Sequence, residues 1–474
     1  MKGIGSHINK LIRNKAGNNL NPAGVLFPVL LFAVLSAGAQ TPQDLQPYVK
    51  LRHSFIVEAY QDPQIEESGL ITDPGMLVSR KKEILNYQGG SGTIITPSGL
   101  ILTNYHVYEK ETKYEYDQEK NMLFKLIPAS MNMYVFMLPE DDYLSPPELR
   151  YEAIPLCGDK WRDIMVLKVS HTPDGAAAQN LALPFTEPGN PFDLGLNEPI
   201  TLIGYPGKGG ETITVTNGKF LGYYREEGNQ RIDGFIKTEA SMSPGSSGGS
   251  AVHNDKLIGI PTLVSAPHLA GADFGFINPV TRAAPSLVKA HTHYGQDMPV
   301  MKDEWFGSKY NTDKTSDHIY ITGKVRSNQT QKGIEEALVI FHKRELEQET
   351  VLNLLKEIRI LKYIGNVKML HKNGASMAEI AEYYEESESQ IRTIIEMEVS
   401  MEDLSAGAVD MLQNGAFYFE EATTEPDGYF MCMAPKEAGL TLLVLAEDTR
   451  EYSRSFSSGA GLYQDLGKVW VNEY

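Results

Sequence analysis

Residues 238–252 place a serine in a setting suited to nucleophilic chemistry. They read T-E-A-S-M-S-P-G-S-S-G-G-S-A-V, with glycines at 245, 248 and 249 around Ser247. Glycine adopts positive φ without steric cost, so the run predicts a tight turn before an apolar strand. Such a turn can direct the N–H groups of Gly245 and Ser247 at one point, as acyl transfer requires of a nucleophile and its oxyanion donors. For this run alone, a flexible Gly/Ser loop is the alternative.

A histidine follows a predicted β-hairpin upstream. Residues 90–107 read G-S-G-T-I-I-T-P-S-G-L-I-L-T-N-Y-H-V. The P-S-G turn allows Thr93–Ile95 to pair with Leu100–Leu102. His106 comes just after the second strand, where a rigid scaffold can present a catalytic group. A structural hydrogen-bonding role is the alternative for a single histidine.

A carboxylate precedes another predicted strand. Asp163 comes directly before I-M-V-L-K-V at 164–169. It is suited to orient a histidine, and a cap or a surface acid is the alternative.

From about Met76, short apolar runs separated by Gly, Pro and Asn predict an all-β domain. Its halves, roughly 76–185 and 190–299, are each long enough for a small barrel, with an active site between them. Residues 108–147 are expected to form an irregular insertion loop.

The three signatures together resemble the trypsin-like serine proteases of the chymotrypsin fold, most closely their HtrA/Deg-like branch. The likeness covers about residues 89–299 and includes I-G-Y-P-G at 203–207 and G-F-I-N-P-V at 275–280. It implies that Ser247 is the nucleophile, His106 the general base and Asp163 the partner that orients the imidazole. It also implies an oxyanion hole formed by the N–H groups of Gly245 and Ser247. Thr262 matches the position where the family often places a hydroxyl against the catalytic carboxylate.

Departures from the family pattern bear on activation and specificity. Ser246 precedes the nucleophile where activatable trypsin-like enzymes carry aspartate, so activation by a newly freed N-terminus is not expected. Ser241, six residues before Ser247, is not acidic, so a preference for Lys or Arg is not supported. Met242 and Leu263 would line a modest apolar pocket for small or medium apolar residues. A glutamyl-endopeptidase-like specificity is a weaker alternative.

The N-terminus and the charge indicate export. Residues 1–39 combine basic residues, an apolar run at 25–35 and a small-residue site, A-G-A, as in a cleaved secretory signal; a membrane anchor is the alternative. Cleavage would remove four basic and no acidic residues, taking the formal net charge from −18 to −22. This argues against nucleic acid and anionic membranes as partners, but not against protein or peptide substrates. The localisation expected is periplasmic or secreted, with no membrane span after signal removal.

The last third of the chain is expected to be a separate domain. After a linker at 301–317, the patterns Y-I-T-G-K-V, T-E-P-D-G-Y-F and L-T-L-L-V-L-A resemble a carboxypeptidase-regulatory-like β-sandwich at 318–474. A helical insertion at about 344–412 interrupts it, with capping boxes at Ser376–Glu379 and Ser387–Gln390. Part of this insertion resembles a DNA-binding helix-turn-helix, but its acidic character and export argue against that function. No PDZ-like domain is recognisable, which puts the cage assembly typical of HtrA-like proteins in doubt.

The fold class predicted is therefore mainly β: a double β-barrel trypsin-like protease domain at 76–300, preceded by an arm at 40–75, and a C-terminal β-sandwich. No cofactor is expected, and no metal, because His291-x-His293 has no apparent third ligand and surface histidines are the better interpretation. With two cysteines, the chain is not a disulfide scaffold. The function expected is an exported serine endopeptidase. The alternative is a catalytically silent, protease-like binding protein that acts through its C-terminal domain.

Overall fold

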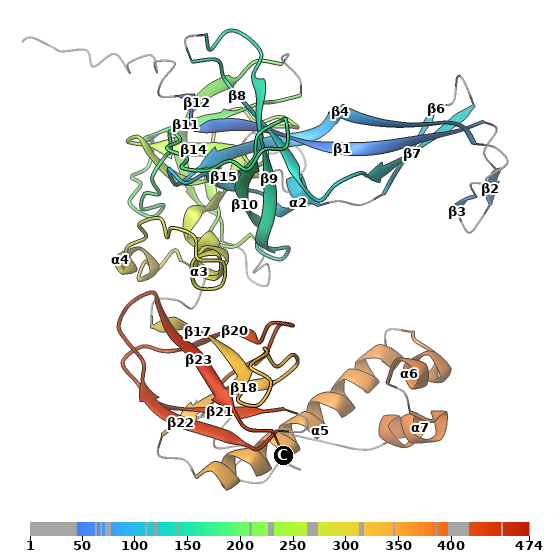
Figure 1. The fold of residues 1–474 in the computed structure, drawn as a ribbon, viewed down its shortest axis with the longest axis vertical. Helices are drawn as coiled ribbons and strands as arrows, with labels where there is room; N and C mark the ends of the chain where they lie inside the picture. The colour runs from blue at the N-terminus through green and yellow to red at the C-terminus, as the bar shows by residue number, and fades with distance from the viewer. Residues whose placement is uncertain are drawn as a thin grey trace, which may run out of the picture. The chain divides into compact units, whose positions relative to one another are not determined.

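The computed structural model describes most of the chain after residue 44. The described range is 45–473 without 62–63, 67–68, 72–76, 110–111, 118, 120, 141, 208–210, 226–231, 263–273, 312–316, 345–346, 373, 385, 397–416 and 447–448. The predicted signal segment at 1–39 lies outside these residues. Residues 42–474 form one compact unit, and Figure 1 labels its helices and strands.

A first barrel carries His106 and Asp163. Its strands are hydrogen-bonded in the order β4 (Leu77–Ile94), β5 (Leu100–Thr103), β10 (Ile164–His171), β9 (Glu148–Asp159), β8 (Met133–Met137) and β1 (Tyr48–Gln61). Strand β1 then pairs with β4, which closes the ring. The hairpin forms in the predicted register, with Ile94 opposite Ile101. Apolar side chains fill the interior, among them Leu51, Ile101, Val135 and Leu167.

Two sequence predictions about this region are wrong. The segment 48–61, expected in an arm outside the protease domain, is a barrel strand. Residues 108–147 are not an irregular loop, because they hold β8 and also β6 (Lys113–Asp117) and β7 (Met122–Pro128). Strands β6 and β7 extend the sheet along the outer part of the β1–β4 ribbon (Figure 1). In the K-Y-E-Y-D sequence of β6, tyrosines alternate with charged residues at the two-residue period of a strand. The three charged residues nevertheless favoured a loop in the prediction. The short strands β2 (Gln64–Glu66) and β3 (Gly69–Ile71) follow β1.

A second barrel carries the Ser247 turn. It is closed, in the order β11 (Pro199–Gly204), β12 (Thr214–Tyr223), β13 (Ile236–Thr238), β16 (Gly275–Pro279), β15 (Lys256–Thr262) and β14 (Ser250–His253). Ile200, Phe220, Ile236 and Ile277 belong to its buried core. The turn leads directly into β14, whose Ala251 pairs with Leu202 of β11. This strand therefore anchors the nucleophile candidate at one end of the barrel.

A short helical segment follows the second barrel and packs against the first. It consists of η4 (Val280–Ala283), α3 (Ala284–Thr292) and α4 (Asp303–Phe306). Leu287 and Ala290 of α3 share a buried cluster with Leu102 of β5 and Val166 of β10. Helix α3 thus covers the strands that lead to His106 and away from Asp163.

The C-terminal region contains two sheets that share one core, as the predicted fold class requires. One sheet has the order β20 (Tyr429–Pro435), β17 (His318–Ser327) and β23 (Tyr463–Val471). The other has the order β19 (Phe417–Thr423), β18 (Leu338–Lys343), β21 (Gly439–Leu445) and β22 (Tyr452–Ser457). Val325 and Phe430 from the first sheet pack with Phe341 and Leu442 from the second.

Three helices occupy the predicted insertion between β18 and β19. They are α5 (Gln348–Lys372), α6 (Met377–Tyr384) and α7 (Glu388–Glu396), and α6 and α7 lie beside one part of α5 (Figure 1). Both capping boxes form: the Glu379 N–H donates to Ser376 Oγ at 3.2 Å, and the Gln390 N–H to Ser387 Oγ at 3.3 Å. None of the described helices combines the length and the apolar character needed to cross a bilayer.

Candidate active site

His106 and Asp163 meet at one end of the first barrel. His106 lies on the short helix α2 (Tyr105–Tyr108), two residues beyond the Asn104 that follows β5. Its Nδ1 lies 2.9 Å from Asp163 Oδ2, and its backbone N–H donates to Asp163 Oδ1 at 3.0 Å. The Asp163 side chain is 13% exposed and the imidazole 43%. Because the carboxylate faces Nδ1, Nε2 is the nitrogen left for proton exchange with a substrate or a nucleophile.

A threonine from the second barrel contacts the same carboxylate. The Thr262 hydroxyl at the end of β15 is buried and donates to Asp163 Oδ2 at 3.0 Å. Asp163 itself has φ +55, a backbone conformation that aspartate tolerates better than most residues. The carboxylate is thus fixed by groups from both barrels.

Strand β4 anchors the carbonyls of the Ser247 turn. The Ser91 hydroxyl donates to the Gly245 carbonyl at 2.9 Å, and the Ser91 N–H donates to the Ser247 carbonyl at 2.9 Å. Gly245 and Gly248 have φ +99 and +79, which glycine allows and other residues rarely adopt. Glycines are therefore required here by backbone conformation.

The N–H groups of Gly245 and Ser247 are available to a ligand. The carbonyl of Pro244 accepts from the Gly207 N–H at 2.8 Å, and that of Ser246 accepts from the Gly249 N–H at 3.0 Å. In a trans peptide the N–H points opposite to the carbonyl of the same unit. The Gly245 and Ser247 N–H groups therefore point away from those contacts, and neither has an acceptor among the described residues.

Asn104, which was not predicted as a site residue, joins the two halves of the site. Its fully buried amide donates to the Asp163 carbonyl at 3.0 Å, and its Oδ1 accepts from the Gly248 N–H at 2.7 Å. One side chain thus spans the Asp163 turn and the Ser247 turn. Its position directly after β5, two residues before His106, was the available signal. An asparagine there is equally common as a turn residue.

Ser247 is 6% exposed. Across the described part of the chain, its hydroxyl makes no hydrogen bond to the His106 imidazole. Catalytic hydrogen bonds are often long or poorly aligned until substrate binds. The shared contact through Asn104 nevertheless brings the turns that carry these residues side by side.

A cavity of about 120 Å³ opens beside the Ser247 turn. Ser241, Met242 and Ser246 line it together with Pro261 and residues of β11 and β12, and no charged side chain is in the described lining. Met242 also packs against Gly275 of β16, where an added Cβ would lie 2.7 Å from the Met242 sulfur. Thr262 contacts Asp163, as described above. Leu263, the other residue predicted for this pocket, lies outside the described residues.

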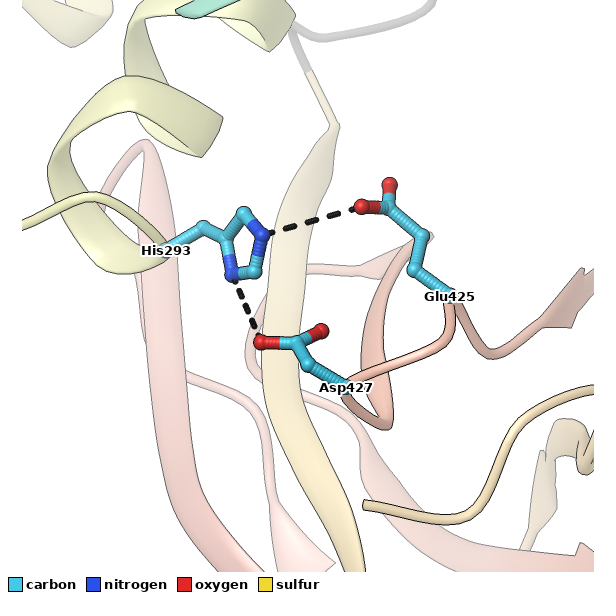
Figure 2. Close-up of side chains that lie close together, drawn as sticks. All are labelled: His293, Glu425 and Asp427. Carbon is cyan, nitrogen blue, oxygen red and sulfur yellow. Dashed lines mark ion pairs between the residues drawn. The ribbon is translucent and has the colours of Figure 1, made fainter.

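The two neighbouring histidines do not form a pair. His291 Nδ1 lies 2.6 Å from the Gln296 carbonyl oxygen. The His293 side chain is only 9% exposed and faces Glu425 and Asp427 (Figure 2). The prediction of surface histidines with no further ligand nearby is therefore wrong for His293. The two acids are more than 130 residues away in the sequence, so local spacing could not reveal them.

Comparison with known proteins identifies the class. Residues 90–260 match the family model of the trypsin-like peptidase domain. With the double barrel and the His106–Asp163 pair, this match shows that the chain carries a trypsin-like peptidase domain.

The curated relatives indicate the branch. Over 205 residues the chain is 30% identical to a probable periplasmic serine endoprotease, DegP-like, of Rickettsia prowazekii, covering 42% of this chain and 32% of the relative. It is 30% identical over 211 residues to the periplasmic pH-dependent serine endoprotease DegQ of Escherichia coli, covering 44% and 38%. The domain is of the HtrA/Deg-like type. The chain spans about a third of the length of these relatives.

A solved structure, the HtrA-type protease AlgW with a decapeptide, aligns with a TM-score of 0.34 and 20% identity, over 53% of this chain and 66% of that one.

Proposed function

We propose that the protein is an exported serine endopeptidase in which Ser247, His106 and Asp163 form a catalytic triad. The observation that carries this proposal is the Asp163 carboxylate bound to His106 Nδ1 at 2.9 Å, tied through Asn104 to the turn bearing Ser247. Support also comes from the trypsin-like peptidase domain and the named activity of its relatives.

In this mechanism the Ser247 hydroxyl attacks the substrate carbonyl while His106 Nε2 takes its proton. Asp163 keeps the proton of the resting imidazole on Nδ1 and stabilises the imidazolium that forms. His106 then gives the proton to the leaving amine, and water hydrolyses the acyl-enzyme by the reverse sequence of proton transfers. Thr262 assists by fixing the Asp163 oxygen that faces the ring.

The Gly245 and Ser247 N–H groups would bind the oxyanion. Removing one such donor typically costs about 3 kcal/mol of transition-state stabilisation. The Ser91 contacts to the carbonyls of both residues fix the turn before substrate arrives, so the donors need little reorganisation during the reaction.

The substrates proposed are proteins or peptides with small or medium apolar residues at the position entering the cavity. The support is the uncharged lining around Ser241 and Met242, since a cationic side chain would find no counter-charge there. The signal-like residues 1–39 and the periplasmic relatives support export.

The test uses the chain without residues 1–39 and the variant Ser247→Ala. Wild-type protein should cleave unfolded casein and react with a fluorophosphonate probe at Ser247. The variant should lose both properties, with turnover reduced roughly 10⁶-fold. Casein cleavage at equal rates by both proteins, or a wild-type protein silent to substrate and probe alike, would refute the proposal. The second result would favour a binding protein with a protease fold.

A further inference from the structure

A largely buried histidine side chain at the end of α3 lies between two carboxylates outside the candidate active site. His293 Nε2 lies 3.7 Å from Glu425 Oε2, and its Nδ1 lies 3.6 Å from Asp427 Oδ2 (Figure 2). The side chain is only 9% exposed, and its buried Nδ1 has no hydrogen-bond partner among the residues that the structure describes. A polar atom held in this way without a partner is costly, which calls for an explanation by function.

Backbone contacts fix the two acids. Glu425 and Asp427 lie in the tight turn between β19 and β20, where the Gly428 N–H donates to the Glu425 carbonyl at 2.7 Å and Gly428 has φ +84. The Tyr429 N–H donates to Asp427 Oδ1 at 3.1 Å. The carboxylates therefore face His293 from a rigid turn.

A neutral imidazole fits this position poorly by itself. Burial lowers the pKa of His293, and the nearby Lys324 and Lys289 also lower it, against the opposing effect of Asp427 and Glu425. The ring is then neutral at pH 7, and one nitrogen presents a lone pair to a carboxylate oxygen. A cation bound between them would turn this repulsion into attraction.

We propose that His293, Glu425 and Asp427 form a site for a divalent transition-metal ion such as Zn²⁺. One donor atom from each residue lies within 4.8 Å of the other two. Donors around a four-coordinate zinc are about 3.4 Å apart, given bond lengths of about 2.0–2.2 Å, so side-chain rotation must draw them together. One imidazole and two carboxylates suit such an ion, whereas Ca²⁺ takes oxygen ligands alone.

Two lysines compensate the acids without the ion. Lys289 of α3 is ion-paired with Glu425 Oε1, and Lys324 Nζ of β17 lies 2.7 Å from Asp427 Oδ2. Their side chains are 24% and 26% exposed, so each can swing toward water. Lys324 holds the same Asp427 oxygen that faces His293, whereas Lys289 holds the Glu425 oxygen that does not. A metal ion bound to Asp427 Oδ2 must therefore displace Lys324, so Lys324 should compete with the metal.

The ion would join parts of the chain that are distant in sequence. His293 caps α3, whose Leu287 and Ala290 pack under β5 and β10, while both acids belong to the C-terminal sheets. Occupancy should therefore strengthen the attachment of the C-terminal sheets to the helix beneath the strands that carry the candidate active site. This inference goes beyond the proposed function and does not depend on it.

The test is Zn²⁺ titration of the chain without residues 1–39, in competition with a chromophoric chelator at pH 7.5. Wild type should bind one ion, and His293→Ala should lose at least about 100-fold in affinity. His291→Ala, two residues away on the same helix end, is the matched control and should bind as wild type does. Near-UV circular dichroism checks that each variant is folded. Glu425→Gln keeps the size of the side chain and should also lose zinc affinity, so it serves as the test if His293→Ala does not fold.

Lys324→Gln separates the metal site from a simple salt-bridge network. Removing a cation close to Asp427 should raise zinc affinity about tenfold, after allowing for solvent screening. Binding should weaken as the pH falls and His293 becomes protonated. Lys289 and Tyr294 face this ring from beside its own helix, and Lys324, Glu425, Asp427 and Tyr429 face it from the C-terminal sheets. Zinc binding that is absent from wild type, or that survives His293→Ala and Glu425→Gln unchanged, would overturn the proposal. Loss of casein cleavage would not, because the readout is metal affinity.

Discussion

Asn104 shows how one buried side chain can position a site without touching substrate. Its amide satisfies the Asp163 carbonyl and the Gly248 N–H together. Asn104→Ala would leave the Asp163 carbonyl without this donor and the Gly248 N–H with only its 3.3 Å contact to the Pro261 carbonyl, at a cost of about 1–3 kcal/mol in stability. The turns would lose their common partner, so we expect kcat for peptide cleavage to fall more than tenfold with little change in KM.

Asn104→Asp is the informative comparison for that prediction. It keeps the acceptor for the Gly248 N–H but replaces the donor to the Asp163 carbonyl with a buried carboxylate oxygen, so it should recover neither the lost stability nor the activity. If both variants cleave casein at the wild-type rate, the bridge between the turns has no catalytic importance.

Gly248 is the residue of the Ser247 turn with the least room for a side chain. An added Cβ would lie 2.1 Å from Thr103 Oγ1 and 2.3 Å from the Ser91 carbonyl oxygen. Gly248→Ala should therefore displace the turn from β4 and β5, abolish fluorophosphonate labelling and lower the melting temperature.

Gly175→Ala is the control for the backbone effect. Gly175 also has positive φ, +84, but a Cβ there would meet no atom of the described residues within 4 Å. Gly175→Ala should lower the free energy of unfolding only by the cost of an alanine with positive φ, about 1–2 kcal/mol. It should leave fluorophosphonate labelling of Ser247 normal. Equal effects of both substitutions on labelling would mean that the close packing around Gly248 is unimportant.

At the scale of elements, the sequence predicted local structure well and long-range structure poorly. The hairpin with Ile94 opposite Ile101 and the capping boxes of α6 and α7 follow from turn chemistry within a few residues. Strand β6 was not predicted because the charged residues between its tyrosines favoured a loop. Strand β1 was not predicted to belong to the barrel because its membership depends on pairing with β4.

The same limit applies to the candidate site. Ser247, His106 and Asp163 each have a local signature, and His106 lies in contact with Asp163. The roles of Asn104 and Glu425 depend on partners 144 and more than 130 residues away. Such contacts arise when strands assemble, and no periodicity in the chain records them.

The packing of α3 on β9 can be followed through Cys157. Its thiol is buried and donates to the Ser286 carbonyl at 3.0 Å, and burial raises its pKa to about 12 from about 9. The folded state therefore holds the thiol proton to higher pH than the unfolded state does. The resulting contribution to the free energy of unfolding is fully present below about pH 9 and is lost as the pH rises toward 12. In a Cys432→Ser background, iodoacetamide at pH 8 should label native protein far more slowly than urea-unfolded protein. Equal rates would show that α3 does not protect this thiol.

At the scale of the whole molecule, an apolar cluster connects the peptidase domain to the C-terminal sheets. Ala284 and Val288 of α3 pack with Phe306 of α4, and with Tyr320 and Leu462 from the C-terminal region. The ion pair of Lys289 with Glu425 and the hydrogen bond of Thr292 with Tyr429 lie in the same interface. Because apolar and polar contacts both cross it, we expect residues 45–473 to unfold as a coupled system.

Phe306→Ala tests this coupling because the ring is fully buried at the centre of the cluster, 1% exposed. Truncating a buried phenylalanine costs about 3–5 kcal/mol, and here the loss falls on contacts between the two regions. Calorimetry should therefore show the single unfolding transition of wild type separating into two, the first at a lower temperature. Leu196→Ala, at a side chain that is 71% exposed, should change stability by no more than about 0.5 kcal/mol. A single transition in Phe306→Ala as narrow as that of wild type would mean that the cluster adds stability without coupling the two regions.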